Sequence, residues 1–172
     1  MAAPRSSSAR GSRVVGQSGR PKAEKAVRED VDDPAAPRRV VNYALQRRSV
    51  LRGLYGGQAF NGFDICDADP YLLRAARFHG VVTQDPCPVC RVTEGAETLT
   101  HVTYVYGDQL GHIAGSAIDP ARLPDMAQDY GEFRVYVVEV CPACHWNHLV
   151  MSFVLGDGRP RKAPAKPRDL LD

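Results

Sequence analysis

Four of the five cysteines occur in two copies of one short motif, Cys-Pro-x-Cys. A Cys-x-x-Cys turn directs two thiolates at one point, and the amides that follow can hydrogen-bond to the sulfur atoms. Two such turns supply the four ligands of a structural Zn²⁺ ion. The sequence therefore predicts one structural zinc, and the predicted ligands are Cys87, Cys90, Cys141 and Cys144.

The two motifs are separated by 50 residues, which is longer than the usual spacing in a zinc ribbon. This interval reads as strand, turn, helix and strand, so an ordered insertion can return the chain to the site. Closing the loop costs about 3–4 kcal/mol, because the entropy scales with the logarithm of loop length. Structural zinc contributes about 10–16 kcal/mol, which outweighs that cost.

Three other uses of the thiols remain open at this stage. Disulfides are disfavoured because no export signal precedes the domain. A thioredoxin-like redox site needs one Cys-x-x-Cys at the start of a helix, whereas the residues after Cys144 read as a strand. A metal other than zinc is the third alternative. Cys66 lies outside the two motifs. We expect it to be either a small buried apolar residue or a fifth, exchangeable thiol.

A polar cluster follows the second motif. Residues three apart on a strand point to opposite faces, so two histidines at this spacing cannot readily share one metal. We expect a hydrogen bond to the ligand shell or a contact with a partner, with the indole packed on the zinc turn. The cluster consists of His145, Trp146, Asn147 and His148.

The elements that must position these residues follow from periodicity and capping. Apolar residues from Val40 to Tyr55 recur at helical spacing and predict a first helix that Gly56 ends. Asp69-Pro70 and Asp119-Pro120 each predict a helix start, because Asp caps free amides and Pro fits the first turn. Residues 99–106, 132–140 and 146–155 read as strands because β-branched and aromatic residues are dense there.

These elements predict an α+β domain over residues 39–155, in which N-terminal helices pack on a small antiparallel sheet that carries the four-cysteine zinc ribbon. Residues 1–38 and 156–172 read as disordered basic tails, because they are rich in Gly, Pro, Ala, Ser and Arg and lack apolar periodicity. The acid-free start also resembles a transit peptide in composition, although its Gly and Pro interrupt any amphipathic helix.

Charge is divided along the chain. The net charge of +2 consists of +4 over residues 1–39, −4 over 40–155 and +2 over 156–172. Attraction to nucleic acid is therefore expected from the tails and not from the core. Both tails contain a Gly-Arg-Pro-basic frame like the core of an AT-hook, although a biased composition produces such frames by chance. The candidate nucleic-acid contacts are Arg20, Lys22, Arg159, Arg161 and Lys162.

The composition excludes several classes of protein. With 44% apolar and 24% charged residues, the chain is neither wholly disordered nor a coiled coil. It has no apolar stretch of membrane-spanning length and no secretory signal, so we expect a soluble, cytoplasmic protein. No phosphate loop, nucleophile elbow or dinucleotide fingerprint is present, and no small-molecule substrate is inferred.

Four motifs in the same order resemble a known family: residues 41–45 (VNYAL), 66–76 (CDADPYLLRAA), 106–108 (YGD) and 146–149 (WNHL). The chain is similar, over about residues 40–155, to an actinobacterial family catalogued only as a domain of unknown function. The resemblance implies a cytoplasmic bacterial protein with a zinc-ribbon-like core. It implies no activity and no catalytic residues.

Zinc ribbons mostly present a rigid surface to a nucleic acid or a protein machine. We therefore expect a non-enzymatic binding module associated with the transcription or translation machinery, whose partner is a protein machine, a nucleic acid or both. The alternatives are an adaptor that binds protein without nucleic acid and, third, a thiol redox enzyme.

Overall fold

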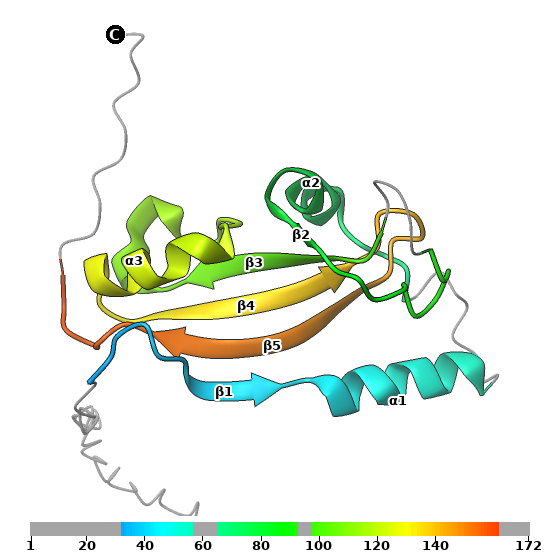
Figure 1. Ribbon diagram of the computed structural model, residues 1–172, viewed down its shortest axis with the longest axis horizontal. Coiled ribbons are helices and arrows are strands. Elements are labelled where there is room, and N and C mark those ends of the chain that lie inside the picture. Colours follow the sequence, from blue (N-terminus) through cyan, green and yellow to red (C-terminus); the bar gives the residue numbers. More distant parts are fainter. Residues whose placement is uncertain (1–31, 57–64, 93–97, 162–172) are drawn as a thin grey trace, which may run out of the picture.

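The computed structural model describes residues 32–56, 65–92 and 98–161. Within these ranges the chain forms one antiparallel sheet of five strands in the order β1-β5-β4-β3-β2, with helices packed against it (Figure 1). The strands are β1 (Arg38–Asn42), β2 (Val81–Val82), β3 (Thr100–Tyr106), β4 (Phe133–Val140) and β5 (Asn147–Leu155). The α-helices are α1 (Ala44–Tyr55), α2 (Pro70–His79) and α3 (Leu123–Asp129), and two 3-10 helices, η2 (Asp108–Ile113) and η3 (Pro120–Arg122), precede α3.

The three long strands form the centre of the sheet. β3 pairs with β4 along its whole length, from Thr100 opposite Val140 to Tyr106 opposite Arg134. β4 pairs with β5 in turn, and a bulge shifts their register between Val137 and Val138. This register brings the start of β3, the end of β4 and the start of β5 to one end of the sheet. The two Cys-x-x-Cys turns lie at that end.

The predicted first helix is wrong at its beginning. Val40 and Val41 belong to β1, which pairs with the edge of β5, and α1 begins only at Ala44. Their spacing fits a helix, but β-branched residues also suit a strand, and hydrogen bonding to β5 decides between the two. Both valines stay about half exposed at this edge, with 56% and 45% of their surface accessible.

The two predicted Asp-Pro helix starts are confirmed. The Asp69 carboxylate accepts a hydrogen bond from the amide of Tyr71 (2.7 Å), and α2 follows directly. The Asp119 carboxylate accepts from the amide of Ala121 (2.9 Å), where η3 leads into α3. Each carboxylate satisfies an amide that has no partner within its helix.

The helices cover different parts of the sheet. Ala76 of α2 packs with Ala68 on Val102 and Val140, near the cysteine end. α3 and η2 close a larger apolar cluster at the opposite end, whose buried members are Val105, Leu110, Ile118, Leu123, Met126, Ala127, Phe133, Val135 and Leu155. A third cluster surrounds the cysteines. Among the described residues, no helix has both the length and the apolar character needed to cross a membrane.

The chain continues in contact with the domain beyond β5. Gly156 takes a left-handed backbone (φ +90°), and its amide donates to the carbonyl of Pro34 (2.9 Å). A Cβ at this position would lie 1.6 Å from the Gly131 carbonyl oxygen, so the close approach requires glycine. Residues 157–161, which the sequence assigns to a tail, therefore begin beside the sheet. Residues 1–31 and 162–172 of the predicted tails lie outside the described ranges.

Replacing the α2 cap tests the link between Asp69 and the helix. Asp69→Ala should lower the free energy of unfolding by about 1 kcal/mol, because the Tyr71 amide loses its acceptor. Asp69→Asn is the matched control, since Asn caps about as well as Asp and should cost much less. Urea unfolding of both variants measures the difference. Equal destabilisation by Ala and Asn would contradict the capping role.

Candidate metal centre

The two Cys-x-x-Cys turns have the same backbone hydrogen bonds. In each turn the amide that follows the second cysteine donates to the carbonyl of the first, from Arg91 to Cys87 (3.0 Å) and from His145 to Cys141 (2.8 Å). The amide of the first cysteine donates in turn to a carbonyl five residues later, that of Val92 or Trp146. Equal sequence spacing thus produces two equivalent turns.

Each turn also places a non-glycine residue in the left-handed region directly after its second cysteine. Arg91 has a φ of 65° and His145 a φ of 66°. This conformation is unfavourable for residues with a Cβ, so it persists only where the surroundings require it. The nearly equal φ values at corresponding positions show that the two turns share this backbone feature.

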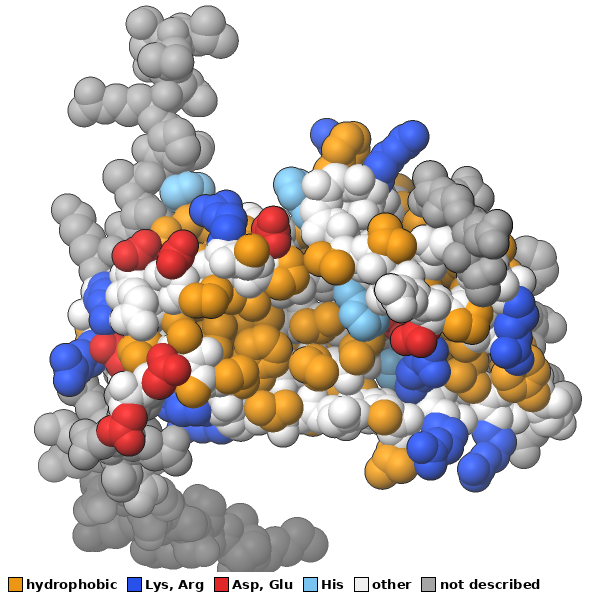
Figure 2. Space-filling view, in the orientation of Figure 1, with side chains coloured by type: hydrophobic (Ala, Val, Ile, Leu, Met, Phe, Trp, Pro, Cys, Tyr) orange, Lys and Arg blue, Asp and Glu red, His pale blue; other side chains and the backbone are white. Residues whose placement is uncertain are grey.

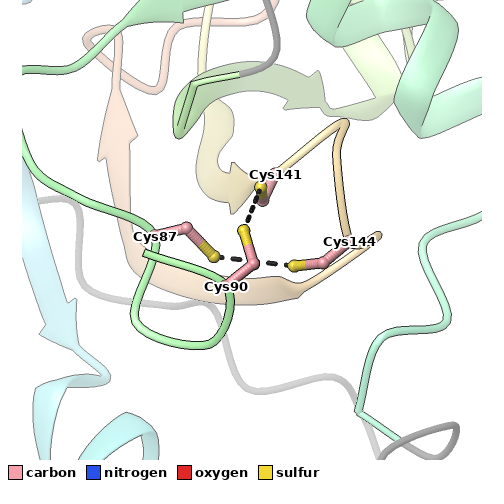
Figure 3. A group of neighbouring side chains, drawn as sticks. All are labelled: Cys87, Cys90, Cys141 and Cys144. Carbon is pink, nitrogen blue, oxygen red and sulfur yellow. Dashed lines mark hydrogen bonds between the residues drawn. The ribbon is translucent and has the colours of Figure 1, made fainter. Parts of the chain in front are cut away.

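The four sulfur atoms meet in one place (Figure 3). All lie within 4.8 Å of one another, and this arrangement can hold a metal ion. Two contacts join the turns crosswise, from Cys87 to Cys144 and from Cys90 to Cys141, each with an Sγ–Sγ distance of 3.6 Å. A tetrahedral Zn–S bond of about 2.3 Å separates neighbouring sulfurs by about 3.8 Å, so the observed distances fit such an ion.

Backbone amides are directed at the sulfurs, as the sequence predicts. The amide of Val89 donates to Cys87 Sγ at 3.4 Å, and the Cys90 sulfur accepts from the amide of Val92. In the second turn, Cys141 accepts from Ala143 and Cys144, and Cys144 accepts from Trp146. Donors placed in this way stabilise negative charge on sulfur, which metal ligation requires.

The thiols differ in their readiness to ionise. Burial raises the pKa of Cys141 to about 11 and also raises the pKa of Cys144. Burial is the largest influence on Cys90 too and acts upward, but hydrogen bonds from the Val92 amide and from the neighbouring thiols together lower its pKa. Four thiolates in so small a volume repel one another, and a divalent cation relieves that repulsion.

A buried carboxylate connects the cysteine end to α1. Glu139 has a side chain that is only 5% exposed, and its Oε1 accepts from the indole Nε1 of Trp146 (2.9 Å) and from Nε of Arg47 (2.6 Å). Trp146 is fully buried against Cys87 and Cys141, which confirms the predicted packing of the indole on the turns. The buried acid therefore has both a charged and a neutral donor, as a buried charge requires.

Sequence reasoning missed this role of Glu139 and Arg47. A signal was present, because strand alternation places Glu139 on the same face of β4 as the buried residues Phe133 and Val135. An acid on a buried strand face needs a partner. The identity of that partner depends on the packing of α1, which no local pattern reveals.

The residues of the polar cluster after the second turn lie in different surroundings. His145 is exposed in the turn and not on a strand, while His148 stacks on Trp146 with ring centroids 5.9 Å apart. The side-chain amide of Asn147 donates to the Asp67 carboxylate (2.9 Å) and not to a sulfur. Neither histidine belongs to the group of side chains that can hold a metal ion among the described residues.

Of the basic residues predicted as nucleic-acid contacts, the structure describes only Arg159 and Arg161. Arg161 donates from its guanidinium to the Tyr130 carbonyl (2.7 Å) and to Asp157 (3.0 Å), so its charge is used within the domain. Arg159 has a side chain that is 81% exposed, 3.7 Å from Asp157. Arg20, Lys22 and Lys162 lie outside the described residues.

The fold separates charge in a way that the net charge of the core conceals. α1 and α2 contain no acidic residue, and their exposed arginines are Arg48, Arg52, Arg74 and Arg77. Around α3, in contrast, lie Asp108, Asp119, Asp125, Asp129 and Glu132. Figure 2 shows acidic side chains mainly at the α3 end and Lys and Arg side chains prominent at the opposite end. The cysteine end is thus the more basic one.

The indole hydrogen bond can be tested by one substitution. Trp146→Phe should lower the free energy of unfolding by about 2–4 kcal/mol, because Glu139 loses a buried donor and the smaller ring leaves a cavity. His148→Ala removes only a partly exposed ring that stacks on the indole and should cost less. Chemical unfolding of both variants gives the comparison. A Trp146→Phe protein as stable as the wild type would show that this contact is unimportant.

Comparison with known proteins identifies relatives of the chain. A family model described as a family of unknown function (DUF5318) matches residues 35–169. The uncharacterized protein Rv0049 of Mycobacterium tuberculosis is 48% identical over 124 residues, which cover 72% of this chain and 87% of the relative. The uncharacterized protein Mb0050 of Mycobacterium bovis matches to the same extent. No solved structure matches the chain. On this evidence, the chain belongs to the DUF5318 family, whose function is unknown.

Proposed function

We propose that this protein is a non-enzymatic binding module whose fold is stabilised by one structural zinc ion. The observation that carries the zinc assignment is the cluster of four sulfurs within 4.8 Å, in two turns with the same hydrogen bonds. Four thiolates form a complete tetrahedral shell that leaves no open position, which is typical of a structural and not a catalytic zinc. In this proposal the module is a zinc ribbon.

In this proposal the zinc ion joins the two cysteine turns, and α1 packs against them. Three buried residues pack around the thiols: Ile65, Leu99 and Trp146. Three less deeply buried residues of α1 also pack there: Val50, Leu51 and Leu54. The Tyr55 hydroxyl donates to the Pro88 carbonyl in the first turn, and the guanidinium of Arg91 lies 5.9 Å from the Tyr55 ring centroid. Loss of the ion is therefore expected to loosen α1 as well as the turns.

The partner surface that we propose lies on α2 beside the second cysteine turn. Arg74, Arg77 and Phe78 of α2 line a surface hollow together with Pro142, which lies between the two cysteines of that turn. Phe78 is 67% exposed and Tyr71 is 80% exposed. Exposed aromatic rings beside exposed arginines suit a single-stranded nucleic acid, because the rings stack on bases and the arginines contact phosphates. In this proposal the module associates with the transcription or translation machinery.

A protein-binding adaptor is the second candidate. Aromatic residues and arginine are also enriched at the centres of protein interfaces, and the stripe of Tyr71, Arg74 and Phe78 has the spacing of one helix face. An acidic protein segment is the expected partner in that case. Binding to nucleic acid separates the two candidates.

Metal analysis tests the zinc assignment. Purified full-length protein should contain about one zinc per chain, and Cys141→Ser should lose most of it and unfold the cysteine end, because a hydroxyl is a much weaker ligand. His145→Ala and His148→Ala are the matched controls and should retain full zinc. Elemental analysis with thermal unfolding measures both properties. Wild-type protein that is folded and free of metal would overturn the assignment.

Removal of two positive charges from α2, compared with removal of two positive charges elsewhere on the domain, tests the binding surface. The double variant Arg74→Ala/Arg77→Ala should weaken binding of a labelled single-stranded oligonucleotide by about tenfold or more and reduce the salt slope by about two. The matched control is Arg122→Ala/Arg134→Ala, which removes two exposed arginines outside α1 and α2. Fluorescence anisotropy over a range of salt gives both quantities. Equal losses in the two variants would contradict a specific surface, and a wild type that binds no oligonucleotide would favour the adaptor.

A further inference from the structure

The central strands carry three tyrosine rings on one face of the sheet. Tyr104 and Tyr106 are two residues apart on β3, so their side chains point to the same face. Tyr136 of β4 lies directly opposite Tyr104 in the strand register, which places its ring on that face too. The rings of Tyr106 and Tyr136 meet edge to face, with centroids 5.6 Å apart and an interplanar angle of 85°. Strand register thus assembles one aromatic group from two strands.

The three rings line an open hollow on the sheet. Val138 of β4 and its partner Leu149 of β5 complete the lining, and the hollow has a volume of about 480 Å³. Tyr106 is 49% exposed, while Tyr104 and Tyr136 are half-buried. We call this surface the tyrosine face, and it consists of Tyr104, Tyr106, Tyr136, Val138 and Leu149.

The helices of the described residues do not line the tyrosine face. The apolar cluster under α3 contains Val105 and Val135, which alternate with the tyrosines along β3 and β4 and therefore lie on the opposite face. α2 packs on the same face as the tyrosines, but nearer the cysteine end, over Val102 and Val140. Tyr104 packs against the edge of that α2 cluster. The tyrosine face therefore adjoins α2 and extends away from the cysteine turns.

Positive charge borders the tyrosine face. Arg134 is exposed and lies opposite Tyr106 in the β3–β4 register, so it extends from the same side of the sheet. Arg74 is exposed on α2 and directly precedes Ala75, which packs against the same cluster as Tyr104. None of the side chains that line the hollow is an acid or a base. A neutral aromatic surface with arginines beside it is complementary to a ligand that combines flat, uncharged rings with anionic linkages.

Tyr104 stays neutral at physiological pH. Burial raises the pKa of this phenol above its usual range, and Tyr106 and Asp69 act in the same direction. Asp69 opposes an anionic ligand near Tyr104, although its carboxylate already accepts a hydrogen bond from the amide of Tyr71. The Tyr104 phenol itself therefore adds no negative charge to the tyrosine face.

We propose that the tyrosine face binds the bases of a single-stranded nucleic acid. The rings stack on the bases, while Arg134 and the α2 arginines contact the phosphates. Sheets that recognise RNA use aromatic rings in this way to stack two or three bases. A duplex keeps its base faces within its own stack, so the expected ligand is a single strand. This inference rests on the nucleic-acid candidate proposed above and adds to the α2 surface a stacking site on the sheet.

The arginines should contribute unequally to the dependence of binding on salt. Arg134 supplies one positive charge beside the tyrosine face, against the two that Arg74 and Arg77 supply on α2. The Arg122→Ala/Arg134→Ala variant should therefore lower the salt slope by about one, and the Arg74→Ala/Arg77→Ala variant by about two.

Matched oligonucleotides separate base contacts from phosphate contacts. Full-length protein is titrated into fluorescein-labelled single-stranded DNA and RNA of one sequence, and into an abasic DNA strand of the same length. The abasic strand keeps the phosphates but has no rings to stack. Fluorescence anisotropy should show that wild type binds the abasic strand about tenfold or more weakly than the DNA strand. The tighter of the DNA and RNA strands identifies the source of the bases.

Substitution of Tyr106 locates the base contacts. Tyr106→Ala should weaken binding of the base-containing strands by about tenfold, with no change in the salt slope or in the affinity for the abasic strand. Tyr106→Phe keeps the ring and should bind like wild type. Tyr55→Ala is the matched control, because it removes a similarly exposed ring (58%) from α1. Thermal unfolding followed by circular dichroism establishes that each variant is folded.

Two results would overturn the proposal. One is an equal wild-type affinity for the DNA strand and the abasic strand. The other is a loss of affinity in Tyr106→Ala that is no greater than the loss in Tyr55→Ala. Either result, together with a large loss in Arg74→Ala/Arg77→Ala, would retain the α2 surface and reject the tyrosine face.

The opposite combination would separate the two surfaces in the other direction. A loss in Tyr106→Ala without a loss in Arg74→Ala/Arg77→Ala would support the tyrosine face and reject the α2 surface. A wild type that binds none of the strands would overturn nucleic-acid binding at both surfaces and favour a protein partner.

Discussion

The sulfur atoms of four cysteines lie together at one end of the sheet, and the arrangement of that end depends on their proximity. The two turns that carry them are separated by a helix-containing excursion, and the pairing of Thr100 with Val140 brings the chain back. Polar backbone groups at both turns are satisfied by the same internal hydrogen bonds. The site therefore consists of two turns with matching hydrogen bonds, and the β3–β4 ladder brings them to the same end of the sheet.

The second constraint is the buried carboxylate of Glu139. A charge in this position is tolerated only because Arg47 and Trp146 both donate to it. The same contacts fix α1 against the sheet and hold the indole over Cys87 and Cys141. The four cysteines, the indole, the carboxylate and α1 are thus connected through one set of contacts.

The two ends of the domain have different chemical characters. The α3 end combines a large apolar cluster with exposed acids, while the cysteine end combines thiols, aromatic side chains and exposed arginines. An average over the core gives a net negative charge and suggests that the tails alone attract polyanions. Folding distributes this charge unevenly, because it places the acid-free helices α1 and α2 at the cysteine end. A binding partner encounters the local charge and not the average.

The sequence by itself determined the thiol pairs, both Asp-capped helices, the three long strands and the family, because each depends on residues that are close together in the chain. It failed for Val40 and Val41, which fit a helix by spacing but join the sheet through hydrogen bonds to β5. Only the tertiary structure decided that Arg47 and Trp146 share Glu139, and that Cys66 packs against the cluster of Cys87, Cys141 and Trp146. The partners in these contacts are up to 92 residues apart, and packing and strand register, which no local pattern specifies, bring them together.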